Sequence, residues 1–400
     1  MIRLNPEQQF IVDRAVDWFY RSNYQIFQYD GPPGSGKSVV LNEIVRRIGL
    51  DPLLEVAAMS YIGAASLVMR TKGLFSAKTI HSWIYDIRSV PMRDKDGNIM
   101  MDTLLNKPIM YPKFVPVDSL DPNIQLIIVD EGYCCPMSLR PQIEKFGIKI
   151  LVCGDQNQLP PVNDNPAFLV NGNIYHLTQC MRQADRRDID MIAKRVGSGL
   201  PLLNGYYGNS LVIGKNELTD DMLMWADAVI CSKNRTRDTI NKRIRSILGH
   251  TSELPEFNEK VVCRKNNWLD GITMSDGYTV NLVNGLIGRV MNQPDISSFD
   301  GKLFTMYFSP DLAPQLRFNA RCNYKYMIAN YEERNVIKSN RYETGNMFEF
   351  AYAITTHISQ GSQFHKVLYI EEPMHPAIQN RLNLVGASRA DEALIYVKPF

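Results

Sequence analysis

Short apolar runs alternate with amphipathic stretches along the chain, which is the pattern of buried strands between helices. Apolar runs lie at residues 26–27, 126–129, 148–153, 228–231 and 393–397. Apolar residues at helical spacing predict a first helix with Asn5 as N-cap and Pro6 as its first residue, and a second helix that follows Ser38. Buried strands that alternate with helices predict an α/β fold with parallel sheets.

Composition makes this a globular chain with no strong overall charge. Its 400 residues are 45% hydrophobic and 22% charged, with a net charge of +2, so a polyanion would be held by a local groove. The seven cysteines are scattered without a C-x-x-C pair, which predicts a reduced, cytoplasmic protein. The N-terminus has no signal-peptide pattern, and the longest weakly polar run, residues 56–69, is too short to span a membrane, so we expect no membrane partner.

The loop after the first strand matches the G-x-x-x-x-G-K-[ST] pattern. Its residues are Gly31, Pro32, Pro33, Gly34, Ser35, Gly36, Lys37 and Ser38. In such a loop backbone N–H groups surround phosphates, the lysine reaches the β- and γ-oxygens, and the hydroxyl ligates Mg²⁺. The sequence therefore predicts a site for ATP and Mg²⁺.

Two later strands add polar groups that suit ATP hydrolysis. The run at 126–129 ends in Asp130 and Glu131. We expect Asp130 to hold Mg²⁺ together with Ser38, and Glu131 to orient or deprotonate the attacking water. Gln158, which follows the strand at 148–153, can donate a hydrogen bond to the γ-phosphate and so detect bound ATP.

Two strand-to-helix turns are candidate nucleic-acid contacts. Ser60 and Gly63 lie in the first turn, and Thr79 and His81 lie in the second. Small residues and hydroxyls allow a nucleic acid strand to approach the backbone, and Thr79 and His81 would contact phosphates. A lone histidine after an apolar residue is more often structural, so both interpretations of His81 stay open.

The second half of the chain is richer in β-like patterns. Gly and Pro residues near 200–205 mark a domain boundary, residues 260–262 and 284–290 predict β ribbons, and residues 291–348 are β-like and rich in aromatic residues. In the first half, Asp96-Gly97 predicts a two-residue hairpin turn within residues 86–116. That segment could also be a surface insertion that only covers apolar area.

These stretches together resemble the superfamily 1 helicases of the RecD/Dda branch, and in build they are most similar to the compact, phage-encoded Dda type. The motifs that carry the resemblance are the phosphate loop, Asp130-Glu131, Gly154-Asp155 with Gln158-Leu159-Pro160-Pro161, Arg182-Gln183, Asn284-Gly285, His357 with Ser359-Gln360-Gly361, and Ser388-Arg389-Ala390. The resemblance implies two RecA-like P-loop domains, the first with an inserted β-hairpin pin and the second with a small SH3-like β insertion. The implied ranges are 1–85 and 117–202 for the first domain, 86–116 for the pin, 203–290 and 349–400 for the second domain, and 291–348 for the insertion.

The resemblance also assigns roles to single residues. Gln8 would read the adenine, although it also fits a capped core helix. Arg182 and Arg389 would be arginine fingers that stabilise the γ-phosphate. Thr356, His357 and Gln360 would couple the nucleotide site to DNA.

The chain departs from the family pattern at several positions. Ile62 and Ala64 stand where relatives usually have Thr and Lys, which removes expected DNA contacts. Gly132 and Tyr133 replace a small or hydroxyl residue and a Ser, and Ser388 replaces a Thr. None of these changes affects Lys37, the two carboxylates or the arginine fingers.

The activity implied by the resemblance is that of an ATP-dependent DNA helicase that moves 5′→3′ on single-stranded DNA and unwinds duplex in replication, recombination or repair. Its expected partners are single-stranded DNA, DNA forks and single-strand binding or replication proteins, and we expect a monomer, in the host cytoplasm if the chain is phage-encoded. Two alternatives stay open. One is an RNA helicase of the same superfamily, and the other is a DNA-activated ATPase that remodels protein–DNA complexes without unwinding.

Overall fold

The computed structural model describes residues 3–102, 106–179, 187–269, 271–273, 279–294, 302–340 and 343–399. Contacts divide the chain into two compact units. Unit 1 comprises Met1–Asp86, Pro116–Lys215 and Ser359–Phe400, and unit 2 comprises Ile87–Val115 and Asn216–Ile358.

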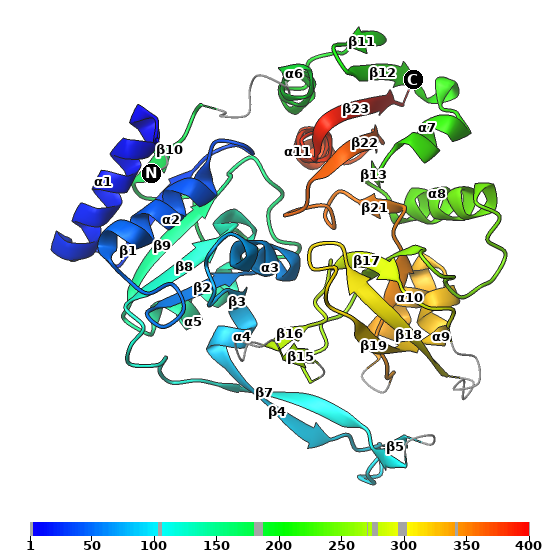
Figure 1. The fold of residues 1–400 in the computed structure, drawn as a ribbon, viewed down its shortest axis with the longest axis horizontal. Helices are drawn as coiled ribbons and strands as arrows, with labels where there is room; N and C mark the ends of the chain where they lie inside the picture. Colours follow the sequence, from blue (N-terminus) through cyan, green and yellow to red (C-terminus); the bar gives the residue numbers. More distant parts are fainter. Residues whose placement is uncertain are drawn as a thin grey trace. The chain divides into compact units, whose positions relative to one another are not determined.

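Unit 1 is built on a six-stranded sheet of order β10-β1-β9-β8-β2-β3, in which the described pairs are parallel (Figure 1). The elements of this part are α1 (Pro6–Arg21), β1 (Ile26–Asp30), α2 (Lys37–Ile48), β2 (Val56–Ser60), α3 (Gly63–Thr71), β3 (Lys78–Thr79), α4 (Ile80–Ile84), β8 (Leu126–Asp130), η1 (Gly132–Cys134), η2 (Met137–Leu139), α5 (Arg140–Glu144), β9 (Lys149–Gly154) and β10 (Ile174–His176). The predicted α/β fold with a parallel sheet is confirmed.

Apolar side chains fill both faces of this sheet. One core joins α1 and α2 to the sheet through residues such as Ile11, Ile44 and Leu151, and a second core joins α4 and α5 through residues such as Ile80, Ile143 and Val152 (Figure 1). Because both faces are covered, the central strands β2, β8 and β9 consist almost entirely of buried residues, as expected for parallel sheets.

Helix α1 begins where the sequence predicts. The Asn5 side chain accepts a hydrogen bond from the Gln8 N–H at 2.8 Å, and the Asn5 N–H donates to the Gln8 side chain at 3.1 Å, so the two residues form a capping box. Pro6 occupies the first helical position. This cap fixes the first turn of α1 and, with it, the place of Gln8.

The remainder of unit 1 is a smaller α/β layer. Its elements are α6 (Arg187–Gly197), β11 (Gly205–Tyr207), β12 (Ser210–Gly214), η3 (Lys215–Glu217), β22 (Phe364–Ile370), α11 (Pro376–Ala387) and β23 (Ala390–Lys398). Strand β23 pairs in parallel with both β12 and β22, while β11 is antiparallel to β12. Helices α6 and α11 pack together, and Leu382 and Val385 of α11 contact Leu159 in a separate apolar cluster.

Unit 2 contains mostly antiparallel strands. Its elements are β4 (Tyr85–Pro91), which starts at the end of unit 1, β5 (Met101–Asp102), β6 (Lys107–Pro108), β7 (Met110–Pro116), α7 (Asp220–Trp225), β13 (Ala228–Cys231), α8 (Asn234–Ile247), β14 (Lys260–Cys263), β15 (Gly271–Thr273), β16 (Thr279–Asn281), β17 (Ile287–Val290), β18 (Leu303–Pro310), β19 (Phe318–Asn323), α9 (Tyr324–Ile328), α10 (Tyr331–Ser339), β20 (Phe348–Phe350) and β21 (Ala353–Thr355). Five strands form a sheet of order β19-β18-β17-β14-β20. This sheet extends beyond the range 291–348 expected for the β insertion, and the domain boundaries themselves stay a prediction.

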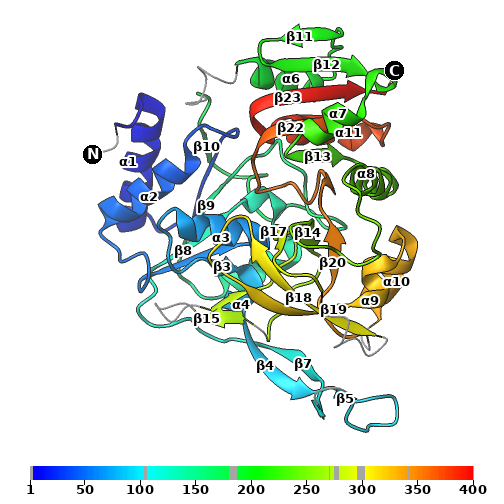
Figure 2. The same ribbon diagram turned by 45° about the vertical axis from the view of Figure 1, so that its right-hand side comes forward.

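Residues 86–116 form a β-hairpin in which β4 pairs with β7 (Figures 1 and 2). The prediction of a two-residue turn at Asp96-Gly97 is wrong. Asp94 and Asn98 close a longer loop through a 2.9 Å bond from the Asp94 N–H to the Asn98 carbonyl, and Gly97 has φ +88°. The Asp94 carboxylate accepts the N–H groups of Asp96 and Asn98, which favours the longer loop with glycine in the left-handed position.

Side chains hold this hairpin to other parts of unit 2. Asp102 of β5 forms an ion pair with Arg321 of β19 at 2.5 Å, and both side chains are mostly buried. The Phe114 ring of β7 meets Trp268 edge to face, with 5.7 Å between ring centroids. These contacts explain why residues 87–115 cluster with unit 2, although they are inserted into the sequence of unit 1.

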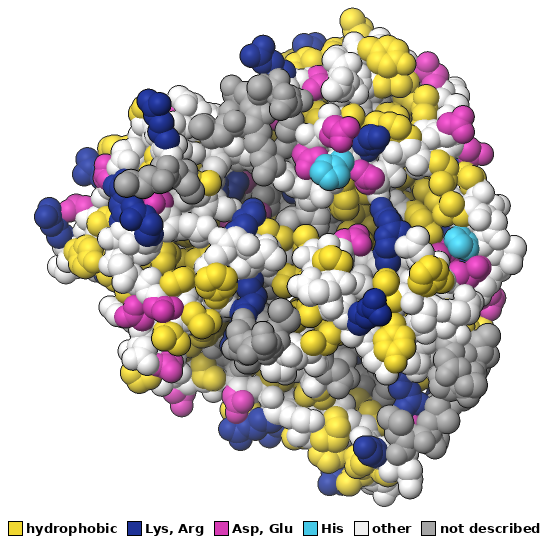
Figure 3. Space-filling model, viewed as in Figure 1, with side chains coloured by type: hydrophobic (Ala, Val, Ile, Leu, Met, Phe, Trp, Pro, Cys, Tyr) yellow, Lys and Arg dark blue, Asp and Glu magenta, His cyan; other side chains and the backbone are white. Residues whose placement is uncertain are grey.

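The surface is of mixed charge. On the face shown in Figure 3, Lys and Arg side chains are dispersed among acidic and apolar side chains, in keeping with the net charge of +2. Across the described residues, no helix is both long enough and apolar enough to span a membrane.

Candidate active site

The parallel register brings the predicted nucleotide residues to one edge of the sheet of unit 1. Asp30 is the register partner of Gly154, Ser60 is the register partner of Asp130, and Val129 is the register partner of Val152, so the four strands end within one residue of the same level. The phosphate loop follows β1 and Glu131 follows β8. Ligands of open α/β sheets bind at this carboxyl edge.

The phosphate loop has the expected form between β1 and α2. Gly34 and Gly36 have φ values of +83° and +87°, which L side chains rarely adopt. A Cβ atom on Gly31 would lie 2.5 Å from Ser35 Oγ, so this glycine is required by close packing. The Lys37 ammonium turns back into the loop and donates to the Gly31 carbonyl at 2.6 Å.

Gln8 of helix α1 contacts the backbone of the phosphate loop. It is 3% exposed, and its Nε2 donates to the Ser35 carbonyl at 3.0 Å, while its Oε1 accepts from Asn5 N–H. A Cβ atom on Gly36 would lie 2.4 Å from Nε2 of Gln8, so the contact is tight. The structure thus gives Gln8 a bracing contact in addition to the adenine contact expected for it.

Asp130 and Glu131 lie at the end of β8 in different environments. The Asp130 carboxylate accepts the Cys153 thiol at 3.1 Å and the Glu131 N–H at 2.9 Å. Glu131 has φ +54°, a left-handed conformation that costs about 1–3 kcal/mol in a residue with a side chain. Such strain is typical of functional positions.

The Glu131 carboxyl is poised to exchange a proton near neutral pH. Burial raises its pKa to about 7, and the neighbouring Asp130 charge acts in the same direction, while Lys37 and Arg389 oppose it. Its Oε2 is buried and has no hydrogen-bond partner among the described residues. An acceptor placed in this way suits a general base.

Sequence reasoning missed three residues that hold the site. Cys153 of β9 binds Asp130, and the hydroxyl of the fully buried Tyr29 donates to the Lys37 carbonyl at 3.0 Å. His176 Nδ1 lies 2.5 Å from Asp30 Oδ1. The pKa of Asp30 is nevertheless raised, because burial outweighs the effect of His176. No sequence motif marks these three residues, because their role is to contact residues of the motifs.

The residues fit a triphosphate nucleotide and a divalent cation. The loop offers backbone N–H groups at the start of α2 and the Lys37 ammonium, and the buried Ser35 Oγ has no hydrogen-bond partner among the described residues. Ser38 and Asp130 would hold Mg²⁺, which prefers oxygen ligands. The Ser38 side chain is partly exposed, and its Oγ accepts a hydrogen bond from the Lys72 ammonium at 3.3 Å.

Residues of the C-terminal motifs also lie in unit 1. Arg389 is 4% exposed, and its guanidinium donates to the Val385 and Ser362 carbonyls and to Ser388 Oγ. Its charge lowers the pKa of Glu131. The predicted arginine finger Arg182 lies outside the described residues.

Gln158 and Gln360 meet at one thiol. The Cys134 thiol lies 3.5 Å from Gln158 Oε1 and 3.4 Å from the Leu159 carbonyl. The Gln360 amide donates to Cys134 Sγ at 3.6 Å and to the Leu159 carbonyl at 3.4 Å. Two residues that the sequence places in separate motifs are therefore neighbours.

The predicted DNA contacts of unit 1 differ in accessibility. Ser60 is fully buried, and Thr79 caps α4 by accepting the Ser82 N–H. Gly63 is the buried first residue of α3. His81 is half-buried, and burial lowers its pKa. Of these four residues, His81 has the most accessible side chain.

Two tyrosines flank His81, and the sequence alone did not rank them above the other aromatic residues. The Tyr85 ring stacks on the His81 ring with 6.0 Å between their centroids. The Tyr61 side chain is 40% exposed, and its ring centroid lies 6.2 Å from that of His81. These rings form an aromatic row of Tyr61, His81 and Tyr85.

Two further predicted DNA contacts, Thr356 and His357, belong to unit 2, while the seventh, Gln360, lies in unit 1 beside Cys134. Thr356 is fully buried, and its hydroxyl and its N–H both donate to the Cys231 carbonyl. His357 is exposed. Thr356 thus has a structural contact, and His357 is free to reach solvent.

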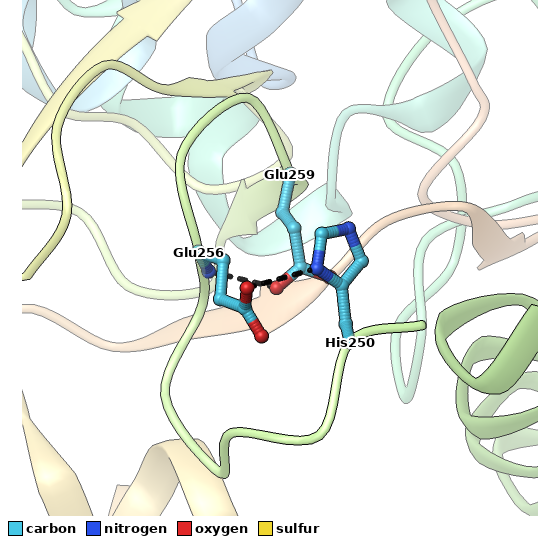
Figure 4. Close-up of side chains that lie close together, drawn as sticks. All are labelled: His250, Glu256 and Glu259. Carbon is cyan, nitrogen blue, oxygen red and sulfur yellow. Dashed lines mark hydrogen bonds and ion pairs between the residues drawn. The ribbon is translucent and has the colours of Figure 1, made fainter. Parts of the chain in front are cut away.

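A separate cluster in unit 2 contains His250, Glu256 and Glu259 (Figure 4). His250 pairs with Glu256 at 3.2 Å. Both Glu259 carboxylate oxygens accept hydrogen bonds from Arg245, at 2.8 and 3.0 Å. Because the guanidinium already satisfies and neutralises the buried Glu259, we assign no cation to this cluster.

The buried Glu131 carboxyl should make the protein less stable as pH rises. Its pKa is higher in the folded state than its ordinary value of 4.5, so the cost of ionising it begins above that value and is complete above about pH 7. The full cost is roughly 3 kcal/mol. Glu131→Gln should therefore raise the melting temperature clearly at pH 8 and only slightly at pH 5.

Glu392→Gln, at an exposed position of β23, is the matched control and should change the melting temperature little at either pH. Thermal unfolding of the ligand-free proteins measures both. An equal gain at the two pH values, or a loss at pH 8, would show that Glu131 is ionised without cost in the folded protein.

Comparison with solved structures identifies the fold. The chain is similar to a Pif1 helicase from a study of DNA unwinding at forked duplex DNA (TM-score 0.56, 18% identity, 98% of this chain and 92% of that chain). It is also similar to the Pif1 helicase from Candida albicans, with a TM-score of 0.52 and 15% identity over 99% of this chain and 95% of that chain. Bacteroides Pif1 in complex with ADP-AlF3 and single-stranded DNA gives a TM-score of 0.54 and 15% identity over 99% of this chain and 92% of that chain. At these identities the likeness shows the fold, which confirms the predicted two-domain RecA-like architecture.

Sequence comparison adds a viral relative and a family. An uncharacterized protein of Acanthamoeba polyphaga mimivirus, R530, is 23% identical over 194 residues, which span 43% of this chain and 37% of that protein. The family model described as an AAA domain matches residues 3–204, which include the phosphate loop and both carboxylates. The chain therefore belongs to the AAA domain family, binds a nucleotide, and has the fold of the superfamily 1 helicases.

Proposed function

We propose that the chain is an ATP-dependent DNA helicase that moves 5′→3′ along single-stranded DNA and unwinds duplex, with a role in replication, recombination or repair. The observation that carries the proposal is the arrangement in unit 1. The phosphate loop, Asp130 and Glu131 lie at one sheet edge, and Arg389 lies close enough to lower the pKa of Glu131. The direction rests on the resemblance to the RecD/Dda branch.

The residues of this site suit hydrolysis of the terminal phosphate. The Lys37 ammonium would bind the phosphate oxygens, and Glu131 Oε2 would accept a proton from the attacking water. Arg389 would stabilise the charge that develops on the γ-phosphate, with Arg182 as its proposed counterpart. Mg²⁺ held by Ser38 and Asp130 would supply positive charge to the phosphate oxygens.

The nucleic acid in this proposal is supported by accessible aromatic residues. Bacteroides Pif1, which shares the fold, was solved with single-stranded DNA. In this chain the aromatic row of Tyr61, His81 and Tyr85 lies beyond the carboxyl ends of β2 and β3. Stacking on such rings requires no particular base sequence, which suits a motor that moves along any strand.

The central test compares the ATPase with no nucleic acid, with single-stranded DNA and with RNA, and then measures release of a strand from duplexes with a 5′ or a 3′ tail. Stimulation by DNA and release only from the 5′-tailed duplex are expected. Lys37→Ala and Glu131→Gln should abolish turnover. Stimulation by RNA alone would indicate an RNA helicase, stimulation without strand release would indicate a remodelling ATPase, and release from the 3′ tail alone would reverse the direction.

The aromatic row should contribute to binding of single-stranded DNA. Tyr61→Ala or Tyr85→Ala should each weaken binding by about 1–3 kcal/mol, because each removes one stacking ring. The dependence of affinity on salt should stay unchanged, because no phosphate contact is lost. Fluorescence anisotropy with a labelled oligonucleotide at several salt concentrations measures both quantities.

Tyr24→Ala removes a ring that is 81% exposed at another site of unit 1 and serves as the control. Tyr61→Phe should keep most of the affinity. If Tyr61→Ala binds DNA as tightly as Tyr24→Ala does, the row is not a stacking surface.

The hairpin at 86–116 should separate strands without contributing to hydrolysis. Replacing residues 93–99 by a two-residue Asn-Gly turn keeps the Met92–Met100 hydrogen bond and the Asp102–Arg321 ion pair. DNA-stimulated ATPase and movement along single strands should persist, while unwinding of the tailed duplex should be lost. Unwinding at the parental rate, or joint loss of stability and ATPase, would show instead that the segment only covers apolar area.

A further inference from the structure

The turn η1, directly after Glu131, departs from the family pattern and makes contacts that have no assigned role in the proposed reaction. A Cβ atom on Gly132 would lie 2.4 Å from Val152 Cγ1, so η1 packs closely on β9. The Cys134 N–H donates to the Glu131 carbonyl at 2.9 Å. Any displacement of η1 therefore moves the backbone of Glu131.

Tyr133 joins η1 to helix α11. Arg381 Nη1 donates to the Tyr133 hydroxyl at 2.7 Å, and the Arg381 guanidinium lies 5.3 Å from the centroid of the Tyr133 ring. Tyr133 is 8% exposed and Arg381 is half-buried, so water competes weakly for this contact. A serine at position 133, which is usual in the family, could not reach as far as the tyrosine hydroxyl does.

Helix α11 leads directly to Arg389. The helix runs from Pro376 to Ala387, and Ser388 caps it. Arg389 donates back to the Val385 carbonyl within the same helix. A helix held near its middle by Tyr133 thus has a fixed end, and that end carries the arginine whose charge acts on Glu131.

We propose that Tyr133 and Arg381 are positioning residues whose contact holds Glu131 and Arg389 in the relative arrangement that ATP hydrolysis requires. This inference rests on the proposed function. Neither residue touches the reacting atoms. The contact acts at both of its ends, through the backbone of η1 on Glu131 and through α11 on Arg389.

The test is a double-mutant cycle with Tyr133→Phe, Arg381→Met and the combined variant. Each single variant should lower kcat about tenfold with KM for ATP within about twofold, because positioning affects the transition state more than nucleotide binding. The combined variant should be no slower than Arg381→Met, because that substitution already removes both the hydrogen bond and the contact of the guanidinium with the ring. Tyr20→Phe is the matched control, because its hydroxyl also makes a 2.7 Å bond, to the Ile48 carbonyl.

A second measurement does not depend on turnover. Hydrogen exchange of the ligand-free chain reports on the Cys134 and Cys135 N–H groups, which bond to the carbonyls of Glu131 and Gly132. Exchange at these amides should accelerate in the three variants and stay unchanged in Tyr20→Phe.

Additive losses of kcat in the cycle, single variants that keep the parental kcat, or unchanged exchange of η1 would overturn the inference. If the parental protein fails to hydrolyse ATP, the proposed function fails, and the exchange measurement still decides whether the contact holds η1. The two failures are therefore distinguishable.

Discussion

The common register of the parallel strands in unit 1 is the constraint on which the site depends. Because Asp30 is level with Gly154 and Ser60 is level with Asp130, residues from distant parts of the sequence end on one edge of the sheet. The apolar cores on both faces fix that register, since a slip by one residue would move every side chain to the opposite face. The arrangement of the nucleotide-site residues at this edge therefore depends on apolar cores that contain none of those residues.

The edge brings together charges that destabilise one another. Asp130 and Glu131 are adjacent carboxyls, and the second is buried and held in a left-handed conformation. A folded protein keeps such a pair only where surrounding structure enforces it. Here the support comes from the Cys153 thiol on Asp130 and from η1 behind Glu131. Stability is reduced at this point in return for a carboxyl that can accept a proton.

Much of this could be predicted from the sequence, because strong local rules acted there. The phosphate loop, the cap of α1 and the strand that ends in Asp130 each depend on neighbouring residues, and each was found where expected. The turn at Asp96-Gly97 was predicted wrongly, because the Asp94 side chain competes for the same backbone N–H groups.

Contacts between distant segments had no such signal. The pairs His176–Asp30 and Arg381–Tyr133 join residues far apart in sequence, and neither residue of a pair reveals its partner. The burial of Ser60 and Thr356 was equally invisible, because small polar residues at strand ends can face either solvent or the interior. Three-dimensional packing decides such positions.

The thiols around the nucleotide site have one more consequence. Burial raises the pKa of both Cys134 and Cys153 well above the usual range, so neither forms the thiolate that reacts with oxidants and alkylating reagents. They stay chemically silent for as long as the packing around Asp130 and Gln158 is intact. Alkylation of these thiols would therefore report local unfolding of the nucleotide site.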